Sequence, residues 1–333
     1  YFMRNNDKTE HRYRRNVILF ALLLVLVLKT VSWLLVCSEN MKNPLENQSG
    51  SAIVWENKNS IDVVFMGDSN VQSSVSPAEL WKKFGMTAYV WGGACYQMYE
   101  TEHNLAKMFR HQSPKVVFIE VNPLQSSKTE VDAINQKVKA DVGNIFEMVL
   151  YNRYMKNLFP NRWHRWSIGE RSLSKGYWFQ TKTQGYLGGN WMADTGDVAQ
   201  FPRTAERSLQ RCVQICKENG AIPVLLATVS PYEWNMGCHN RTTQLAKSMD
   251  VDFLDLNLQT QEMGLDCTQD FSDGGLHMNY KGAQKNCLYI GQYLAERYKV
   301  ADHRSESAYL QWNKDCETYL QYLETAIEKG KQY

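Results

Sequence analysis

The sequence predicts an α/β protein, a three-layer sandwich with a parallel five-stranded sheet, preceded by one N-terminal transmembrane helix. Short apolar runs alternate with segments of helical periodicity after residue 60. This alternation is typical of a parallel sheet that helices cover on both faces. One of the runs, "KVVFIEVN" at 115–122, suits a strand buried on both faces. A still longer apolar run near the N-terminus has the length that a bilayer requires.

The N-terminal run is "NVILFALLLVLVLKTVSWLLV", residues 16–36, and Lys29 is its only charged residue. Its length is about the 20 residues that a helix needs to cross the hydrocarbon core of a bilayer. Three arginines stand shortly before the run, whereas acidic residues outnumber lysine just after it. The positive-inside rule then predicts a single-pass protein of the cell membrane, with residues 1–15 cytoplasmic and everything after about residue 37 extracytoplasmic.

A cleaved signal peptide is the alternative interpretation of the same run. The stretch "ILFALLLVLVL" has the length of a signal peptide's apolar region and follows basic residues. No A-x-A-like cleavage site follows it, and Val36 occupies the position where a lipidation site at Cys37 would need a small residue. We therefore favour an uncleaved anchor, followed by a polar tether over 37–59.

Charge and cysteine content exclude several classes of function. The 37 Lys and Arg nearly balance the 35 Asp and Glu, so there is no electrostatic reason to expect a nucleic acid as partner. The eight cysteines include no C-x-x-C pair, so zinc and redox motifs have no support, and we expect no metal and no cofactor. Cys212 and Cys216 suit one buried helix face. Cys238 and Cys267 are the only pair that we consider for a disulfide in an oxidising compartment.

The first half of the predicted sheet contains three strands and two helices. An apolar run over 61–66 gives the first strand and ends in Gly-Asp-Ser. A short helix over 77–84, a second strand over 87–91 and a longer helix over 98–110 follow. The run over 115–122 completes this half as the third strand.

The second half repeats the alternation. A helix over 204–219 ends at Gly220, a typical C-terminal cap, before the fourth strand, "AIPVLLATV", at 221–229. A helix over 242–249, a fifth strand, "VDFLDL", at 251–256 and a closing helix over 282–298 complete the domain. We assign the domain to residues 60–300.

Residues 125–203 interrupt the alternation, and we expect an insertion, in the form of a helical lid over the carboxyl edge of the sheet. It contains four of the ten tryptophans, namely Trp163, Trp166, Trp178 and Trp191. Aromatic rings can line a core or bind a sugar face, so Trp178 and Trp191 are candidates for substrate binding. In the C-terminal segment, 301–333, apolar residues at helical spacing over 305–331 predict an amphipathic helix. Packing on its own domain is favoured over a partner-binding coil.

Reactive side chains are expected in the crevice outside the carboxyl ends of the strands. Ser69 follows the first strand and Asn122 ends the third, while His277 lies in a glycine-rich loop before the last helix, four residues after Asp273. Serine needs a base to become a nucleophile, and the base needs a group that fixes its tautomer. These residues therefore predict a Ser69–His277–Asp273 triad. A strand end that merely caps the next helix is the alternative for the Gly-Asp-Ser turn.

An oxyanion needs hydrogen-bond donors that are already in position. The backbone N–H of Ser69, a backbone N–H between Gly93 and Cys95 in "WGGAC", and the Asn122 side-chain amide are the candidates.

These motifs resemble the SGNH hydrolases, the superfamily of GDSL-type esterases and acyltransferases, over about residues 60–300. The four matching blocks are "FMGDSN", "YVWGGACYQ", "FIEVN" and "DGGLHMNYKGA". The resemblance implies an SGNH/flavodoxin-like fold with Ser69 as nucleophile, His277 as base, Asp273 as its orienting carboxylate, and Asn122 with the Gly93 region as oxyanion hole.

The sequence departs from the pattern of this superfamily at three points. Asn70, a further candidate for substrate binding, replaces the usual Leu, and "VNP" replaces Gly-x-Asn-Asp. Asp273 precedes His277 by one residue more than in D-x-x-H. Asp270 or a backbone carbonyl is therefore an alternative partner for His277.

A looser resemblance concerns membrane-tethered members of the superfamily that decorate bacterial surface polymers. The single anchor, the outward domain and the ending "LHMNYKGA" are similar to the teichoic-acid D-alanylation protein and to alginate-type acetyltransferases. Those proteins work with a multispanning membrane-bound O-acyltransferase, so the resemblance implies such a partner and a glycan or polyol polymer as acceptor.

Two hypotheses of function follow. The leading one is acyl transfer to, or ester hydrolysis on, a cell-envelope polysaccharide or teichoic-acid-type polymer through an acyl-Ser69 intermediate. The alternative is a non-catalytic glycan-binding or scaffolding subunit on a degenerate SGNH fold, which the altered third block and the Asp273 spacing suggest.

Overall fold

The computed structural model describes residues 2–36, 50–125 and 171–330, together with positions 135, 138 and 142. The chain divides into two units, of which one comprises Tyr1–Asn40 and Ile134–Gly169 and the other Met41–Ala133 and Glu170–Tyr333. The second unit contains the sheet and every described candidate site residue.

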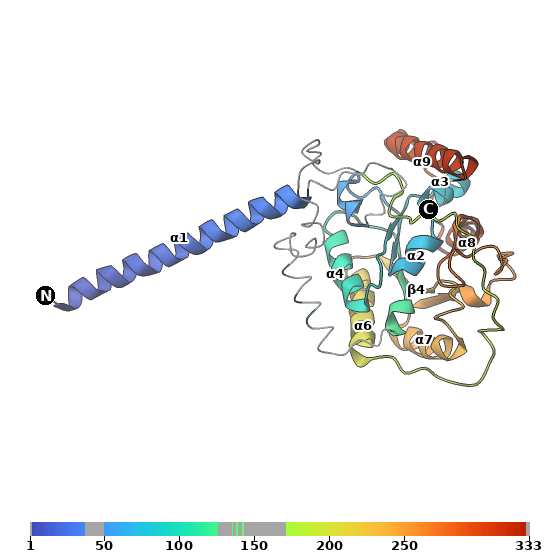
Figure 1. Ribbon diagram of the computed structural model, residues 1–333, viewed down its shortest axis with the longest axis horizontal. Helices are drawn as coiled ribbons and strands as arrows, with labels where there is room; N and C mark the ends of the chain where they lie inside the picture. The colour runs from blue at the N-terminus through green and yellow to red at the C-terminus, as the bar shows by residue number, and fades with distance from the viewer. Residues whose placement is uncertain are drawn as a thin grey trace. The chain divides into compact units, whose positions relative to one another are not determined.

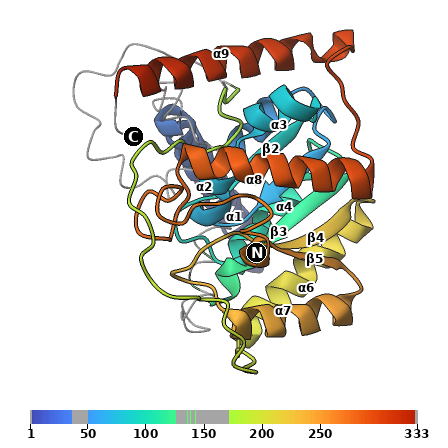
Figure 2. The ribbon, with the colours of Figure 1, turned by 90° about the vertical axis from the view of Figure 1, so that its right-hand side faces the viewer.

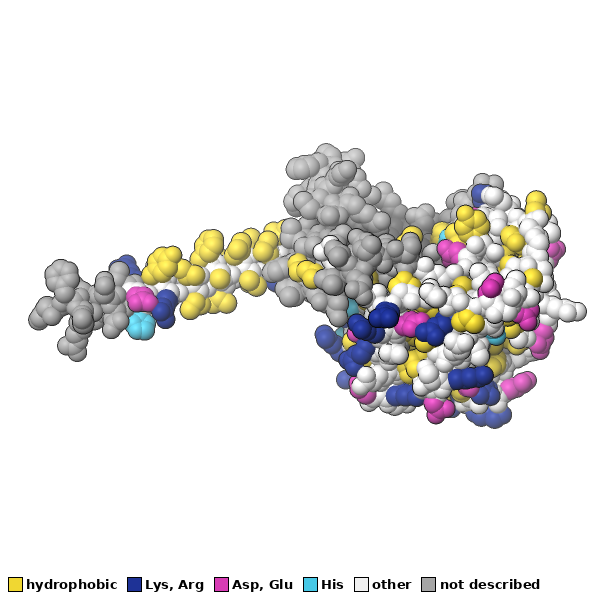
Figure 3. Space-filling model, turned by 90° about the horizontal axis from the view of Figure 1, so that it is seen from below, with side chains coloured by type: hydrophobic (Ala, Val, Ile, Leu, Met, Phe, Trp, Pro, Cys, Tyr) yellow, Lys and Arg dark blue, Asp and Glu magenta, His cyan; other side chains and the backbone are white. Residues whose placement is uncertain are grey.

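In the first unit, helix α1 spans Phe2–Val36 and so includes the whole apolar run. Large apolar side chains between Val17 and Val27 are exposed along it (Figure 3). No helix in the described part of the chain combines the length and the mean hydropathy of a membrane span. The helix is therefore confirmed, whereas its predicted role as a transmembrane anchor is not.

In the second unit, five strands form one parallel sheet in the order β2-β1-β3-β4-β5 (Figure 2). The strands are β1 Val63–Met66, β2 Ala88–Trp91, β3 Val116–Glu120, β4 Ile222–Ala227 and β5 Asp252–Asp255. Each lies within a predicted strand, so the parallel five-stranded sheet is confirmed. From β1 the chain continues to β2, which lies on one side of β1, and then returns to β3, which lies on its other side. Such a switch point is where open α/β sheets form their binding crevices.

Alternate strand residues pack against helices on opposite faces of the sheet, as the apolar strands predict. Val64, Met66 and Val117 point to one face, and Val63, Phe65 and Val116 to the other. The first face packs against α4 Met98–Met108, α6 Arg203–Glu218 and α7 Met236–Met249 (Figure 1). The second packs against α2 Ser69–Ser74, α3 Pro77–Phe84 and α8 Tyr280–Tyr293, which continues as the π-helical turn η6 Leu294–Tyr298.

Two helix starts differ from the prediction because side-chain caps fix them. Asn235 accepts a hydrogen bond from the backbone N–H of Cys238 at 3.1 Å, so α7 begins six residues before the predicted start at 242. Asn279 caps α8 in the same way, through Lys281 N at 3.0 Å. Apolar periodicity does not reveal either cap.

The last part of the predicted tether belongs to the folded unit. Residues Gly50–Trp55 form a 3-10 helix, η1, and Ile53 is fully buried in the core. Glu56 is also buried, where it accepts a hydrogen bond from Lys175 Nζ at 2.8 Å. A tether extending to residue 59 is therefore too long, because the buried side chains of Ala52 and Ile53 and the Lys175–Glu56 ion pair fix this segment.

Residues 171–202 of the predicted insertion contain neither helix nor strand, whereas its described positions 135, 138 and 142 are helical. The expected helical lid is therefore not formed by 171–202. The backbone of 171–202 instead bonds to the loop that precedes α8: Gln184 N donates to Phe271 O at 2.9 Å and Tyr186 N to Cys267 O at 2.8 Å. Trp163 and Trp166 lie outside the described residues.

The C-terminal segment folds back on its own domain, as predicted. After the short η7 Ser307–Tyr309, helix α9 Leu310–Glu328 buries Trp312 and Tyr319. Trp312 packs near Trp81 of α3 with ring centroids 6.5 Å apart, and Trp81 Nε1 donates to Asn313 Oδ1 at 2.9 Å.

The one disulfide considered from the sequence, between Cys238 and Cys267, is not formed, because both thiols are free. Cys238 is buried and its thiol donates to Gln125 Oε1 at 3.3 Å. Cys212 and Cys216 are both fully buried on one face of α6, as expected.

Candidate active site

Ser69 is the first residue of α2, directly after the tight turn that leaves β1, and lies three residues beyond the last strand residue, Met66. The capping role in this turn belongs to Asp68, whose Oδ1 accepts from Asn70 N at 2.8 Å. Ser69 Oγ is therefore not needed as the cap. Gly67 allows the close approach below the turn, because a Cβ there would lie 2.1 Å from Glu120 Oε2.

A continuous line of hydrogen bonds joins the three predicted triad residues. Ser69 Oγ lies 2.9 Å from His277 Nε2. His277 Nδ1 lies 2.5 Å from Asp273 Oδ2, and the backbone N–H of His277 donates to Asp273 Oδ1 at 2.8 Å. Both carboxylate oxygens thus fix the imidazole in the orientation that a base for Ser69 requires.

The loop conformation explains the additional residue between Asp273 and His277. Gly274 and Gly275 have φ angles of +86° and +106°, which residues with a Cβ atom rarely adopt. The loop closes through a hydrogen bond from Ser272 N to His277 O at 2.9 Å. The two glycines therefore let the loop turn so that the Asp273 carboxylate reaches His277 despite the longer spacing.

Asp270, the alternative partner of His277, is engaged elsewhere. Its Oδ2 accepts from Lys285 Nζ at 2.7 Å and from Asp266 N at 2.6 Å. Burial alone would raise the pKa of Asp273, but the hydrogen bonds from His277 outweigh it and lower that pKa below its ordinary value. Asp273 is therefore ionised at neutral pH, as the orienting role requires.

The predicted oxyanion donors lie at the same edge of the sheet as Ser69. In register, Met66 of β1 lies beside Trp91 of β2 and Ile119 of β3, and Gly93 and Asn122 follow these neighbours by two and three residues. Gly92 lies directly against the nucleophile turn, since a Cβ there would be 2.4 Å from Asp68 O. Cys95, two residues beyond Gly93, is exposed.

The side chain of Asn122 is buried at this edge, in η2 Asn122–Gln125. Its Nδ2 donates to Thr228 Oγ1 at 3.3 Å, and its Oδ1 is buried without a hydrogen-bond partner in the described part of the chain. The location of Asn122 agrees with the predicted role of oxyanion donor. The role itself stays a prediction.

The three candidates for substrate binding have different surroundings. Trp178 lies against His277, with ring centroids 5.0 Å apart in an edge-on arrangement, and thus borders the triad. Asn70 is buried and its Nδ2 donates to Glu233 Oε2 at 2.8 Å. Trp191 is half-buried and its Nε1 donates to Asn257 Oδ1 at 3.0 Å, so it is bonded into the framework of the domain.

Sequence reasoning missed two carboxyl groups beside the nucleophile, those of the partly buried Asp68 and of Glu120. Burial raises the pKa of Asp68 to about 6, and burial together with the neighbouring Asp68 raises the pKa of Glu120 well above its ordinary value. Glu120 is fully buried and ends β3. A glutamate inside the apolar run "VVFIEV" was the available signal, because a buried carboxyl needs a partner.

Solved structures that resemble this chain include GDSL-like lipases and esterases. A GDSL-like lipase from Bacteroides thetaiotaomicron is 12% identical, with 71% of this chain and 88% of that chain covered and a TM-score of 0.36. A psychrotrophic esterase from Pseudoalteromonas is 10% identical, with 71% of this chain and 99% of that chain covered and a TM-score of 0.40. A family 3 carbohydrate esterase from Clostridium thermocellum is 12% identical, with 72% of this chain and 99% of that chain covered and a TM-score of 0.37.

No protein-family model and no curated protein sequence matches this chain. Because the TM-scores lie below 0.5, the function is inferred from the geometry of the site alone.

Proposed function

We propose that this chain is a serine esterase or O-acyltransferase that works through an acyl-Ser69 intermediate. The observation that carries the proposal is the line of hydrogen bonds from Ser69 Oγ through His277 to Asp273, with distances of 2.9 and 2.5 Å. If Ser69 only capped a helix, or if His277 were only a structural histidine, neither would require a serine, a histidine and a carboxylate bonded in that order at a switch point of the sheet.

The reaction follows from this geometry in two steps. Ser69 Oγ attacks the ester carbonyl carbon while its proton moves to His277 Nε2. The tetrahedral intermediate collapses, the C–O bond to the alcohol breaks, and His277 returns the proton to the departing alcohol. Asp273 holds the other imidazole proton on Nδ1 throughout and stabilises the positive charge of the ring. In the second step, water or an acceptor hydroxyl gives its proton to His277 Nε2 and attacks the acyl carbon. The new tetrahedral intermediate collapses, the bond between the acyl carbon and Ser69 Oγ breaks, and His277 returns the proton to Ser69 Oγ.

Asn122 and the backbone N–H groups of Ser69 and of the Gly93–Cys95 segment are proposed to bind the oxyanion. Removing one such donor typically costs about 10²- to 10³-fold in kcat. The half-buried ring of Trp178 beside His277 is proposed to contact the acceptor.

The finer part of the proposal is that the acceptor is a cell-envelope glycan or teichoic-acid-type polymer, and that α1 anchors the protein in the membrane beside a multispanning O-acyltransferase. Exposed apolar side chains along α1 and the arginines that precede its apolar run support the anchor. Accessibility labelling in cells tests it. Labelling of residues after 60 from the cytoplasmic side would contradict the anchor without affecting the chemistry.

Hydrolysis of 4-nitrophenyl acetate by the purified full chain tests the chemistry. We expect turnover that Ser69→Ala abolishes and that Ser76→Ala leaves unchanged. Ser76 is a matched control, because it is buried nearby and its Oγ has no hydrogen-bond partner in the described part of the chain. Adding glycerol and quantifying acetylglycerol then separates transfer from hydrolysis. No turnover above the buffer background by either the wild type or Ser69→Ala would instead support the non-catalytic glycan-binding subunit.

A further inference from the structure

The nucleophile turn and Asn122 both contact one buried chain of polar groups under the site. Glu120 Oε2 accepts from the backbone N–H of Asp68, the residue before Ser69, at 2.8 Å. Glu120 Oε1 accepts from Thr228 Oγ1 at 2.7 Å. Thr228 Oγ1 in turn accepts from Asn122 Nδ2 at 3.3 Å. The order of contacts is thus the nucleophile turn, Glu120, Thr228 and Asn122.

This chain of groups comes from adjacent strands of the sheet. Glu120 ends β3, and Thr228 directly follows β4, whose neighbour in the sheet is β3. Both side chains are fully buried. Pairing of β3 with β4 fixes the separation of the two backbones, and the hydrogen bond between the two buried side chains restricts their rotamers.

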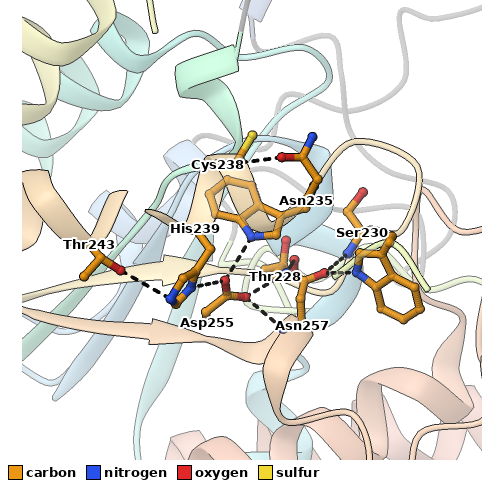
Figure 4. A network of polar contacts seen from close by, with 10 residues as sticks. Thr228, Ser230, Asn235, Cys238, His239, Thr243, Asp255 and Asn257 are labelled. Carbon is orange, nitrogen blue, oxygen red and sulfur yellow. Dashed lines mark hydrogen bonds and ion pairs between the residues drawn. The ribbon is translucent and has the colours of Figure 1, made fainter. Parts of the chain in front are cut away.

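Thr228 is held from its other side as well. Asn257 Nδ2 donates to the backbone oxygen of Thr228 at 2.9 Å and to Asp255 Oδ1, also at 2.9 Å (Figure 4). Asp255 Oδ2 accepts from Trp234 Nε1 and from His239, at 2.9 and 2.8 Å. The backbone from which the Thr228 hydroxyl projects is therefore anchored to the end of β5 and to α7.

The space beneath the nucleophile is shaped for Glu120. A Cβ at Gly67 would lie 2.1 Å from Glu120 Oε2 and 2.5 Å from Glu120 Cβ, so the carboxyl occupies the place that a side chain at 67 would need. Burying a carboxyl group is unfavourable unless its hydrogen bonds are made. The Glu120 carboxyl makes those bonds with Asp68 N and Thr228 Oγ1, so it fixes the nucleophile turn relative to the end of β4.

We propose that Glu120 and Thr228 are positioning residues, which set the amide of Asn122 relative to Ser69 Oγ for oxyanion binding. The inference rests on the proposed esterase or transferase function. Neither residue is assigned a contact with substrate. Thr228 acts through Asn122, and Glu120 acts through both Thr228 and the backbone of the nucleophile turn.

The test uses Thr228→Val, which keeps the shape of the side chain and removes the hydroxyl. With 4-nitrophenyl acetate and the full chain, we expect kcat to fall about 10- to 100-fold, somewhat less than for loss of a whole oxyanion donor, with KM within about twofold. Thr228→Ser keeps the hydroxyl, so it should retain kcat to within about threefold of the wild type. Thr242→Val is the matched control, a fully buried threonine whose hydroxyl has no hydrogen-bond partner in the described part of the chain.

A double-mutant cycle separates positioning from a merely structural effect. If Thr228 acts through the Asn122 amide, Thr228→Val should lower kcat by less than about threefold in the Asn122→Ala background, because the effects of residues that act as a unit are not additive. An equal loss in both backgrounds, no loss in the single variant, or failure of a folded Thr228→Ser to restore kcat would overturn the inference. Turnover that does not depend on Ser69 would overturn the proposed function as well, which distinguishes the two failures.

Discussion

Replacing Asp273 with asparagine tests which carboxylate completes the triad. Asp273 makes two hydrogen bonds to His277, one from the ring Nδ1 at 2.5 Å and one from the backbone N–H at 2.8 Å. In Asp273→Asn the amide oxygen can still accept from the backbone, so the loop keeps its shape. The amide NH₂ then faces Nδ1 and donates to it, which shifts the ring proton to Nε2. A protonated Nε2 cannot accept the proton of Ser69.

The expected consequence is a loss of kcat of about 10⁴-fold, the size seen when the base of a triad is held in the wrong tautomer. The assay is hydrolysis of 4-nitrophenyl acetate by the full chain. Circular dichroism should show an unchanged fold, because the substitution alters no volume and retains one of the two bonds.

Asp270→Asn is the matched control in the same loop. Asp270 is 1% exposed and binds Lys285 Nζ at 2.7 Å, so this variant should lose stability while the folded protein keeps kcat to within a few-fold. If a folded Asp270→Asn lost about 10⁴-fold and Asp273→Asn kept more than a tenth of wild-type activity, the assignment of Asp273 would be refuted.

Three further predictions concern stability and specificity. Lys175→Met should lower the free energy of unfolding by about 3–5 kcal/mol in a urea titration. It removes the buried ammonium that lies 2.8 Å from Glu56 Oε1 and 2.9 Å from Asp315 Oδ2 and leaves only Arg171, 3.9 Å from Asp315, as a nearby cation; a loss under about 1 kcal/mol would contradict this. Trp178→Ala should change the preference between a disaccharide and glycerol as acyl acceptors, and an unchanged ratio in folded protein would end its proposed binding role. Because the pKa of Asp273 is lowered in the fold, its stabilising effect relative to Asp273→Asn should be complete above the unfolded pKa of about 4 and disappear as the pH falls through the folded value; a stability difference independent of pH between about 2 and 6 would oppose this.

The sheet and the triad could be predicted because their signals are local. Each strand is a short apolar run, and parallel strands place their carboxyl ends at one edge. Ser69, Asn122 and His277 follow strands or precede the last helix, so topology alone brings them to that edge. The end of "VVFM" in Gly-Asp-Ser is thus explained by a turn that places Ser69 Oγ 2.9 Å from His277 Nε2.

The choice between Asp273 and Asp270 could not be made from the sequence. It depends on the positive φ angles of Gly274 and Gly275, which turn one carboxylate toward His277 and leave the other beside Lys285. Both aspartates precede the histidine within one loop, so spacing alone favours neither.

The buried network under the site was missed for a related reason. Glu120 is one polar residue in an apolar run, and its partners, Asp68 and Thr228, are 52 and 108 residues away in the chain. Periodicity reports only local structure, so it reveals neither partner. Helix α2 was missed because its six residues are too few for a periodic pattern.

The central claim is that Ser69 becomes covalently acylated with His277 as its base. Mass spectrometry of the full chain after reaction with an activated aryl phosphonate tests this most directly. We predict one adduct, located on Ser69, which forms with the wild type, is absent from Ser69→Ala and forms about 10³-fold or more slowly with His277→Ala. An adduct on another residue as the main product, or wild-type turnover by Ser69→Ala, would contradict the mechanism.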